Sequence, residues 1–264
     1  MRYACGYGDK VPTEAHFSQM KKRIKKEGFL EIEYSLRHEA LKLRKSQLLA
    51  ALGLIQAAVV DGTDFRAWSS RDMKDNRKGF GDPDARVGKG KKGFIVGYQS
   101  LFLADIEGFP LGHIEAPVNV NEKKLVETLL AKVLGEDYEV ELLVGDSQFE
   151  SVQLFDWLKA SRIAHIIARK RRKGHDNPNV LTVKDRIDVD GPQYLRVIYK
   201  RLRAMAESLN GRIKSRLDFS QFTWQGLRNA SIHTSLVVSG VYAAVIAAAK
   251  LGRPDLQYSI AYFA

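Results

Sequence analysis

The sequence predicts an α/β protein in which a mixed five-stranded sheet is flanked by helices. Three strand-like apolar segments come first and are followed by strand-like and helical segments in alternation. Strands joined by a short turn pair antiparallel, whereas strands separated by a helix pair in parallel. The chain has 264 residues, of which 45% are hydrophobic, and this is sufficient to build a buried core.

The antiparallel part of the sheet is expected from three apolar runs. The first run leads into Asp61, and the other two flank a turn at Glu107-Gly108 that predicts a hairpin. Leucines at helical spacing predict an amphipathic helix ahead of the first strand. In chain order we expect an irregular segment over residues 1–30, the helix over 39–54, strands over 54–60, 93–104 and 111–117, and a glycine-rich loop over 69–92.

The parallel part is expected from alternating segments that end in a long helix. The expected elements are a helix over 121–134, a strand over 138–144, a helix over 147–160, a strand over 163–168, a polar loop over 170–192 and the long helix over 194–217. The charge-free stretch Asn229–Ala249 is long enough to cross a bilayer. It contains several polar residues and is the only such stretch, so we expect a helix buried in a core, and no membrane partner.

Composition restricts the class of protein and its partners. A net charge of +11 suggests a polyanionic partner, although charge alone leaves nucleic acid and no particular partner equally open. The single cysteine, Cys5, excludes an internal disulfide framework and a cysteine-based zinc cluster, and it fits a reducing compartment. Residues 1–30 contain no apolar segment typical of a secretory signal.

Three acidic residues could form a metal site. We expect Asp61 and Asp146 at the ends of the first and fourth strands, where open α/β sheets bind ligands. If these strands are neighbours, the two carboxylates approach each other and need cations or hydrogen-bond donors. Glu207 in the long helix would complete an all-oxygen site suited to Mg²⁺ or Mn²⁺. The alternative is more frequent on spacing alone: an aspartate after an apolar run is often a turn residue or a helix N-cap.

The long helix carries charged residues on one side. Tyr199, Arg203, Glu207 and Lys214 fall within roughly 80° of one another at about 100° per residue. Such a stripe would suit the edge of an active-site cleft. It would equally suit a solvated helix face with ordinary pairs of the Arg203–Glu207 type.

Six short motifs, in order from the first strand to the long helix, carry a resemblance to a known family. They are Val59-Val60-Asp61-Gly62-Thr63, Asp82-Pro83-Asp84-Ala85-Arg86, Gly97-Tyr98, Pro117-Val118-Asn119-Val120, Gly145-Asp146-Ser147 and Arg203-x₃-Glu207-x₆-Lys214. Together they resemble the DDE transposases of bacterial and archaeal insertion sequences. The last motif looks like the tyrosine–arginine–glutamate–lysine signature of that family's last catalytic helix. The resemblance covers about Leu54 to Ala249.

The resemblance implies an RNase H-like fold and a metal site. Asp61, Asp146 and Glu207 match the three carboxylates that hold two Mg²⁺ or Mn²⁺ ions in the family. Arg203 and Lys214 match its basic positions and would hold DNA phosphates.

Two residues near the matched positions fit the family's pattern less closely. Tyr199 is one residue further from the arginine than in that pattern, so it is carried over only weakly. Asp64 follows Asp61 by three residues, and the match favours Asp61 as the first carboxylate.

The implied activity is that of a DNA transposase. It comprises metal-dependent phosphodiester hydrolysis and strand transfer at insertion-sequence ends, with no covalent protein–DNA intermediate. The implied partners are double-stranded DNA, as transposon ends and as target, and a second copy of the chain in a homodimer. The implied location is the prokaryotic cytoplasm, at the nucleoid. The basic run before the long helix is either a solvated charge run or a DNA-backbone contact, and beside such a site we favour the contact. It consists of Arg169, Lys170, Arg171, Arg172 and Lys173.

The sequence departs from the family at its beginning. Family members usually carry a longer helical region ahead of the first aspartate, which recognises element ends. We therefore expect a helical remnant of it over 1–53, a catalytic domain over 54–250 and a tail over 251–264. An alternative function is a truncated, transposition-inactive DNA-binding remnant. An unrelated metal-dependent nuclease on the same fold is less favoured because of the signature helix.

Overall fold

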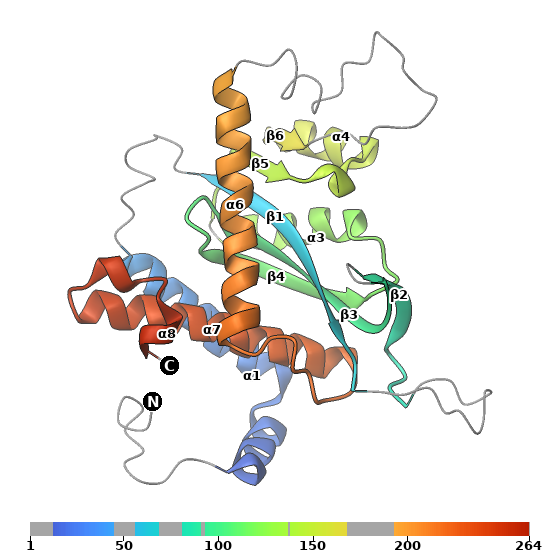
Figure 1. Ribbon diagram of the computed structural model, residues 1–264, viewed down its shortest axis with the longest axis vertical. Coiled ribbons are helices and arrows are strands. Elements are labelled where there is room, and N and C mark those ends of the chain that lie inside the picture. The colour runs from blue at the N-terminus through green and yellow to red at the C-terminus, as the bar shows by residue number, and fades with distance from the viewer. Residues whose placement is uncertain are drawn as a thin grey trace.

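The protein is a three-layer α/β structure built on a mixed six-stranded sheet (Figure 1). The computed structural model describes residues 13–44, 56–68, 81–90, 93–136, 138–167 and 193–263. The predicted class, a mixed sheet flanked by helices, is confirmed. The described part of the sheet has one strand more than the five expected.

The elements follow one another in the order that the sequence predicts, apart from the additional strand. The strands are β1 (Ala57–Arg66), β2 (Arg86–Gly90), β3 (Gly93–Asp105), β4 (Pro110–Pro117), β5 (Leu142–Gly145) and β6 (Ala164–Ile167). The helices are α1 (Glu14–Leu43), α3 (Lys123–Leu134), α4 (Val152–Ala160), α6 (Gln193–Arg216), α7 (Leu227–Lys250) and α8 (Ile260–Phe263), with short 3₁₀ helices η1 (Ser147–Phe149) and η3 (Pro254–Leu256).

β1 lies in the middle of the sheet and joins its two halves. On one side it pairs antiparallel with β3, which also pairs antiparallel with β2 and β4. On the other side it pairs in parallel with β5, and β5 pairs in parallel with β6. The first and fourth predicted strands, here β1 and β5, are therefore neighbours, which is the condition that the sequence analysis left open.

Different helices cover the two faces of the sheet. On β4, a Cβ at Gly112 would meet Leu129 and Val133 of α3, whereas the next side chain, His113, contacts Glu33 of α1. Successive strand residues point to opposite faces, so α3 and α1 lie on opposite sides of the sheet. In Figure 1, α6 crosses the sheet in front of β1, and α1 and α7 run side by side below it.

β2 lies within residues 69–92, which we expected to form a loop. Its sequence, with charged residues and glycines, lacks the apolar alternation by which a strand is recognised. The strand exists because it pairs with the beginning of β3, up to the pair Gly90↔Gly93. Gly88 is required there, since a Cβ at this position would lie 2.6 Å from the carbonyl oxygen of Val118. Tertiary pairing has overridden local propensity.

The N-terminal helix is longer and begins earlier than predicted. We expected residues 1–30 to be irregular and a helix over 39–54, but α1 begins after the N-cap Thr13 and ends before Arg44, whose backbone is extended. The remainder of the predicted helix, residues 45–54, lies outside the described residues. A capping box between Thr13 and His16 starts the helix. Lys25, with φ 61°, interrupts the helical geometry. Buried Phe29 fixes part of α1 in the fold, so packing rather than amphipathic spacing defines this helix.

The apolar stretch Asn229–Ala249 belongs to α7, as expected. α7 is long and apolar enough to cross a membrane by length and composition. In the structure it packs against α1 and β4, and a row of its side chains, including Val238 and Tyr242, is fully buried. This is the burial expected of a core helix.

The Asp82-Pro83-Asp84 motif caps the N-terminus of α7. The buried carboxylate of Asp82 accepts hydrogen bonds from the Gly226 N–H (2.9 Å) and the Tyr98 hydroxyl (2.7 Å). Asp84 accepts from the Leu227 N–H at 2.9 Å. Both carboxylates satisfy backbone donors at the positive end of the helix dipole, so this motif has a structural role.

Candidate active site

The first candidate carboxylate, Asp61, lies in the middle of β1 and not at its end as we predicted. β1 continues to Arg66 because its second half pairs with β3, from Asp61↔Phe102 to Arg66↔Gly97. The parallel pairing with β5, in contrast, stops at Val59↔Val144. Asp61 therefore lies just beyond the parallel part of the strand.

The register places Asp61 and Asp146 side by side. Each aspartate comes two residues after one member of Val59↔Val144, the last pair of the parallel ladder, in which neighbouring strands lie about 4.8 Å apart. Their backbone positions are therefore level with each other just beyond the paired part. Val59 and Val144 pack in one cluster with Leu202 of α6. By the alternation of side chains along a strand, both aspartates are on the face that α6 covers.

Asp146 also has the ordinary role that we weighed for it. It is the N-cap of η1, and its Oδ1 accepts a hydrogen bond from the Gln148 N–H at 2.7 Å. This bond fixes one carboxylate oxygen of a half-buried side chain. Capping a turn and serving in a site are compatible, since a carboxylate has two oxygens and about four acceptor positions.

Arg203 of α6 lies between the acidic residues. Its Nη2 donates to Oε1 of Glu207 at 3.0 Å. Burial by itself lowers the pKa of Arg203, but Tyr199, Asp146 and Glu207 together outweigh this and raise the pKa. The hydroxyl of Tyr199 in turn reaches the Gly145 carbonyl at 3.5 Å, next to Asp146. Arg203 thus interacts both with Asp146, directly after β5, and with Glu207 on its own helix.

Glu207 lies on the stripe that the sequence predicts, but its carboxylate is paired with Arg203 and its side chain is 61% exposed. Among the residues that the structure describes, no three His, Cys, Asp or Glu side chains are gathered closely enough to hold a metal ion. The register brings the backbone positions of Asp61 and Asp146 to one level, and the metal-binding roles of Asp61, Asp146 and Glu207 stay predictions, as does the role of half-buried Lys214.

Asn210 is a site residue that the sequence reasoning missed. It is buried on α6, and its Nδ2 donates to Oδ2 of Asp61 at 2.5 Å. Its Oδ1 is buried and accepts no hydrogen bond from any described group. The sequence reasoning considered charged residues on this helix, and asparagine is uncharged. The available signal was its spacing, three residues after Glu207 and seven after Arg203, which places it on the same face of the helix.

These residues fit a divalent cation. The two carboxylates and the Asn210 amide oxygen, which has no hydrogen-bond partner among the described residues, are oxygen donors of the kind that Mg²⁺ and Mn²⁺ prefer. A buried, unsatisfied acceptor costs roughly 1–3 kcal/mol, and coordination of an ion would offset that cost.

The predicted basic run before α6 lies outside the described residues. It consists of Arg169, Lys170, Arg171, Arg172 and Lys173, within residues 168–192. Its contact with DNA stays a prediction.

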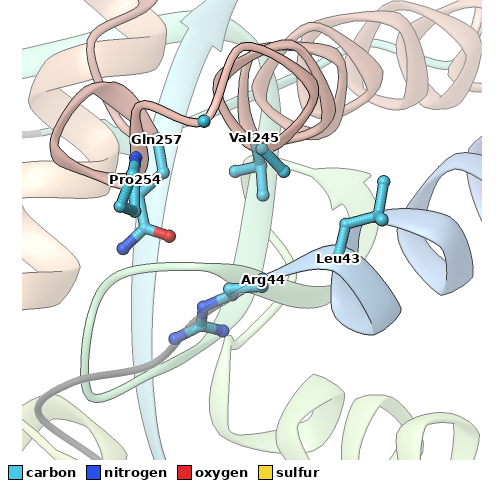
Figure 2. Close-up of a pocket in the computed structure, with 7 residues that line it drawn as sticks. Leu43, Arg44, Val245, Pro254 and Gln257 are labelled. Carbon is cyan, nitrogen blue, oxygen red and sulfur yellow. The ribbon is translucent and has the colours of Figure 1, made fainter.

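A pocket between the ends of α1 and α7 is separate from the acidic residues (Figure 2). Arg44 lies on its wall, with Val245 and Pro254 among the other lining residues. The guanidinium of Arg44 is already paired with Asp105 and Glu107, so it offers little charge to a ligand.

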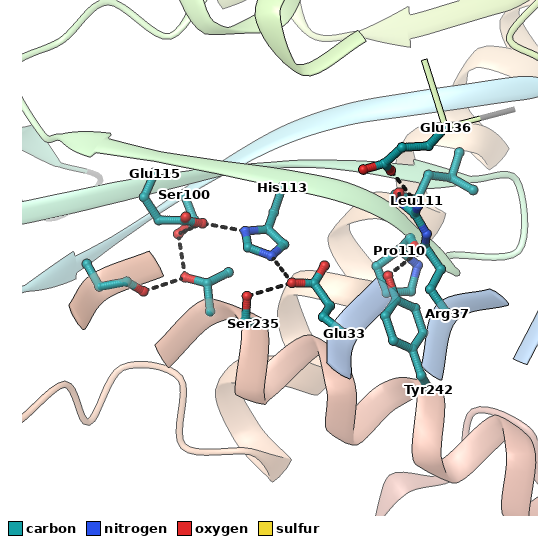
Figure 3. A network of polar contacts seen from close by, with 12 residues as sticks. Glu33, Arg37, Ser100, Pro110, Leu111, His113, Glu115, Glu136, Ser235 and Tyr242 are labelled. Atoms are coloured by element: carbon teal, nitrogen blue, oxygen red, sulfur yellow. Dashed lines mark hydrogen bonds and ion pairs between the residues drawn. The ribbon is translucent and has the colours of Figure 1, made fainter. Parts of the chain in front are cut away.

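A second group of titratable side chains is buried between α1, β4 and α7 (Figure 3). His113 contacts Glu115 through Nδ1 (2.7 Å) and Glu33 through Nε2 (2.9 Å), and Ser235 donates to Glu33. Burial alone would lower the pKa of His113, but the glutamates Glu115 and Glu33 raise it to about 10. Burial alone would raise the pKa of Glu33, and His113 and Ser235 lower it to about 2. The cluster is a charged clamp between helices and sheet.

The fold and the arrangement of Asp61 and Asp146 under a helix define the class as an RNase H-like α/β domain. The family model described as the transposase DDE domain matches residues 52–239. The chain therefore belongs to the DDE transposase family, and the resemblance found in the sequence is confirmed. Among curated proteins, none matches the chain.

Proposed function

We propose that this protein is a metal-dependent DNA transposase that hydrolyses phosphodiester bonds and transfers strands at the ends of its insertion sequence. The observation that carries the proposal is the register of β1 and β5, which puts Asp61 and Asp146 level with each other under α6. Membership in the DDE transposase family supports transposition as the general function.

The proposed metal site consists of Asp61, Asp146 and Glu207. Glu207 would join the aspartates when its carboxylate leaves Arg203, which is possible because the side chain is exposed and the pair spans one helical turn. Two Mg²⁺ or Mn²⁺ ions would activate a water or a DNA 3′-hydroxyl and stabilise the leaving oxygen.

The remaining residues of α6 would bind and orient the DNA. Arg203, next to Asp146, would hold a phosphate through its planar fork, and Lys214 would act as a point charge further along the same helix. The run Arg169–Lys173 would contact the DNA backbone without reading sequence. The net charge of +11 supports a nucleic-acid partner.

The proposal extends to assembly and location. Transfer of two element ends suits a homodimer in the active complex, acting on double-stranded DNA in the prokaryotic cytoplasm at the nucleoid. We assign the catalytic unit to residues 54–250, with residues 1–53 and 251–264 flanking it.

The test is a cleavage and joining assay with the full chain. The substrate is a supercoiled plasmid that carries the DNA flanking the gene, incubated with Mg²⁺ or Mn²⁺ and compared with EDTA. We expect metal-dependent nicking and joined products from the wild type, and neither from Asp61→Asn nor from Asp146→Ala. Asp64→Asn is the matched control. Asp64 is three residues further along β1 and so points to the opposite face, and it should retain activity.

The outcomes separate the alternatives. Binding without cleavage under every metal condition would identify the protein as an inactive DNA-binding remnant and overturn the proposal. Cleavage without joining and without preference for the flanking DNA would indicate a metal-dependent nuclease. Loss of activity in Asp64→Asn but not in Asp61→Asn would mean that the first carboxylate has been assigned wrongly.

A further inference from the structure

Asn210 is one of two described side-chain amides whose buried oxygen has no hydrogen-bond partner; the other, Gln56, lies before β1 and is only partly buried, whereas Asn210 is buried against Asp61. Its Nδ2 donates to Asp61 Oδ2 at 2.5 Å, and its Oδ1 is buried without a partner in the described structure. Buried amide oxygens are nearly always hydrogen-bonded, so one without a partner points to a group that binds there.

The position of Asn210 indicates which kind of group its Oδ1 binds. It lies three residues after Glu207 and four before Lys214, on the face of α6 that covers the sheet at Asp61. Asn210 therefore contacts the first aspartate directly, whereas Glu207 is held by Arg203. An asparagine gives a cation a neutral oxygen ligand and adds no further repulsion beside Asp61 and Asp146.

We propose that Asn210 belongs to the metal site: its amide NH₂ positions the Asp61 carboxylate, and its unpaired Oδ1 is an oxygen ligand for a divalent cation bound beside Asp61. The inference rests on the proposed function, because it requires a metal site at Asp61. The inference adds Asn210 as a fourth protein ligand beside the three carboxylates, and the cation becomes the partner of its buried Oδ1.

The competing role for Asn210 is purely structural. Asn210 could simply hold Asp61 and fasten α6 to β1, with the unpaired oxygen as a tolerated cost. Substitution then alters the stability of the fold but leaves the affinity for metal unchanged. Metal affinity, measured directly, is thus the readout that separates the two roles.

The experiment is a titration of the full chain with Mn²⁺, in which free Mn²⁺ is followed by its paramagnetic resonance signal and Tm is measured with and without the ion. The variants are Asn210→Leu, which keeps the branching of the side chain and removes both polar atoms, and Asn210→Asp, which keeps the oxygen and replaces the donor NH₂ by a second oxygen. Asp61→Asn is the reference for loss of the site. Gly211→Ala is the matched control on the same helix, since a Cβ there meets nothing within 4 Å.

We expect Asn210→Leu to weaken Mn²⁺ binding about 10- to 100-fold, the range for residues that support metal ligands. Asn210→Asp should bind Mn²⁺ at least as tightly as the wild type, and its Tm should rise at least as much when Mn²⁺ is added. Gly211→Ala should match the wild type in affinity.

Three outcomes overturn the inference, and they differ in whether the proposed function is overturned with it. If Asn210→Leu binds Mn²⁺ within twofold of the wild type while Asp61→Asn does not bind it, Asn210 is structural and the proposed function stands. If the wild type binds no Mn²⁺, or if Asp61→Asn binds it unchanged, the metal site of the proposed function falls as well. Should Asn210→Leu fail to fold, a smaller Mn²⁺-induced rise in Tm for Asn210→Asp than for the wild type overturns the inference.

Discussion

Arg203 holds Glu207 across one turn of α6, with its Nη2 3.0 Å from the carboxylate. The negative charge of Asp146, directly after β5, also attracts this guanidinium. An arginine placed between two proposed metal ligands keeps like charges tolerable before a cation and DNA arrive. The carboxylate partner, Glu207, is largely exposed and Arg203 is partly exposed, so the pair is weak enough to be exchanged for new partners.

The first prediction concerns this arginine. Arg203→Ala should lower the single-turnover rate of DNA cleavage by about 10²-fold, because a preorganised cation beside the reacting phosphate is lost. Arg203→Lys should recover only part of the rate, since it restores the charge but not the planar fork. Rates would be measured at saturating DNA and metal. An Arg203→Ala protein that cleaves as fast as the wild type contradicts the assignment.

The second prediction concerns the basic run before α6. The double substitution of Arg171→Ala with Arg172→Ala should reduce the salt slope of binding to random duplex DNA by about 2, at roughly 0.9 per phosphate contact. Lys124→Ala with Lys132→Ala makes the same charge change on exposed positions of α3, on the opposite face of the sheet. That control should leave the slope unchanged. Equal slopes for the wild type and the Arg171/Arg172 variant would rule out the contact.

The third prediction concerns the cap of α7. Asp82→Ala should lower the free energy of unfolding by about 3 kcal/mol, because the Tyr98 hydroxyl and the Gly226 N–H both lose their buried acceptor. Tyr98→Phe removes one donor and should cost only about 1 kcal/mol. Urea unfolding of both single variants and of the double variant checks this. Costs that simply add would show that Asp82 and Tyr98 do not act together.

The fourth prediction concerns pH and the buried clamp of His113 and Glu33. The pKa of His113 is raised to about 10, so its contribution to stability is complete below about pH 6.5 and is lost as the pH rises to about 10. The pKa of Glu33 is lowered to about 2, so its contribution is complete above about pH 4.5 and is lost as the pH falls to about 2. Both contributions are complete only between about pH 4.5 and 6.5.

Urea unfolding measured from about pH 4.5 to about pH 10 tests the clamp. His113→Ala should cost about 3–5 kcal/mol near pH 6, because the carboxylates of Glu33 and Glu115 then face each other in the interior. The variant should also lose the decline in stability between pH 6.5 and 10. His38→Gln, at an exposed position of α1, is the control and should follow the wild type. An unchanged alkaline decline in His113→Ala would assign that decline to another group.

Much of the sheet could be predicted from the sequence because its signals are local. Apolar runs, turns and helical spacing are encoded within about ten residues, and the rule that crossovers pair strands in parallel predicts the parallel part of the sheet. The rule does not choose neighbours, and the pairing of β1 with β5 is a contact between distant parts of the chain. β2 was not predicted because its glycines and charged residues show no strand pattern, and only pairing with β3 makes this segment a strand. The early start of α1 was not predicted for a similar reason, since the packing of α1 on α7 is a contact between distant parts of the chain.

The sequence by itself determined the order of the elements apart from β2, the α7 core helix and the candidate carboxylates Asp61 and Asp146. Only the tertiary structure decided that β1 and β5 are neighbours, that Asp61 lies within a strand and that Glu207 is paired with Arg203. It alone showed the contact of Asp61 with Asn210, 149 positions further along the chain. The physical reason is that such contacts depend on how a helix is seated on a sheet, and side-chain packing over the whole fold sets that geometry.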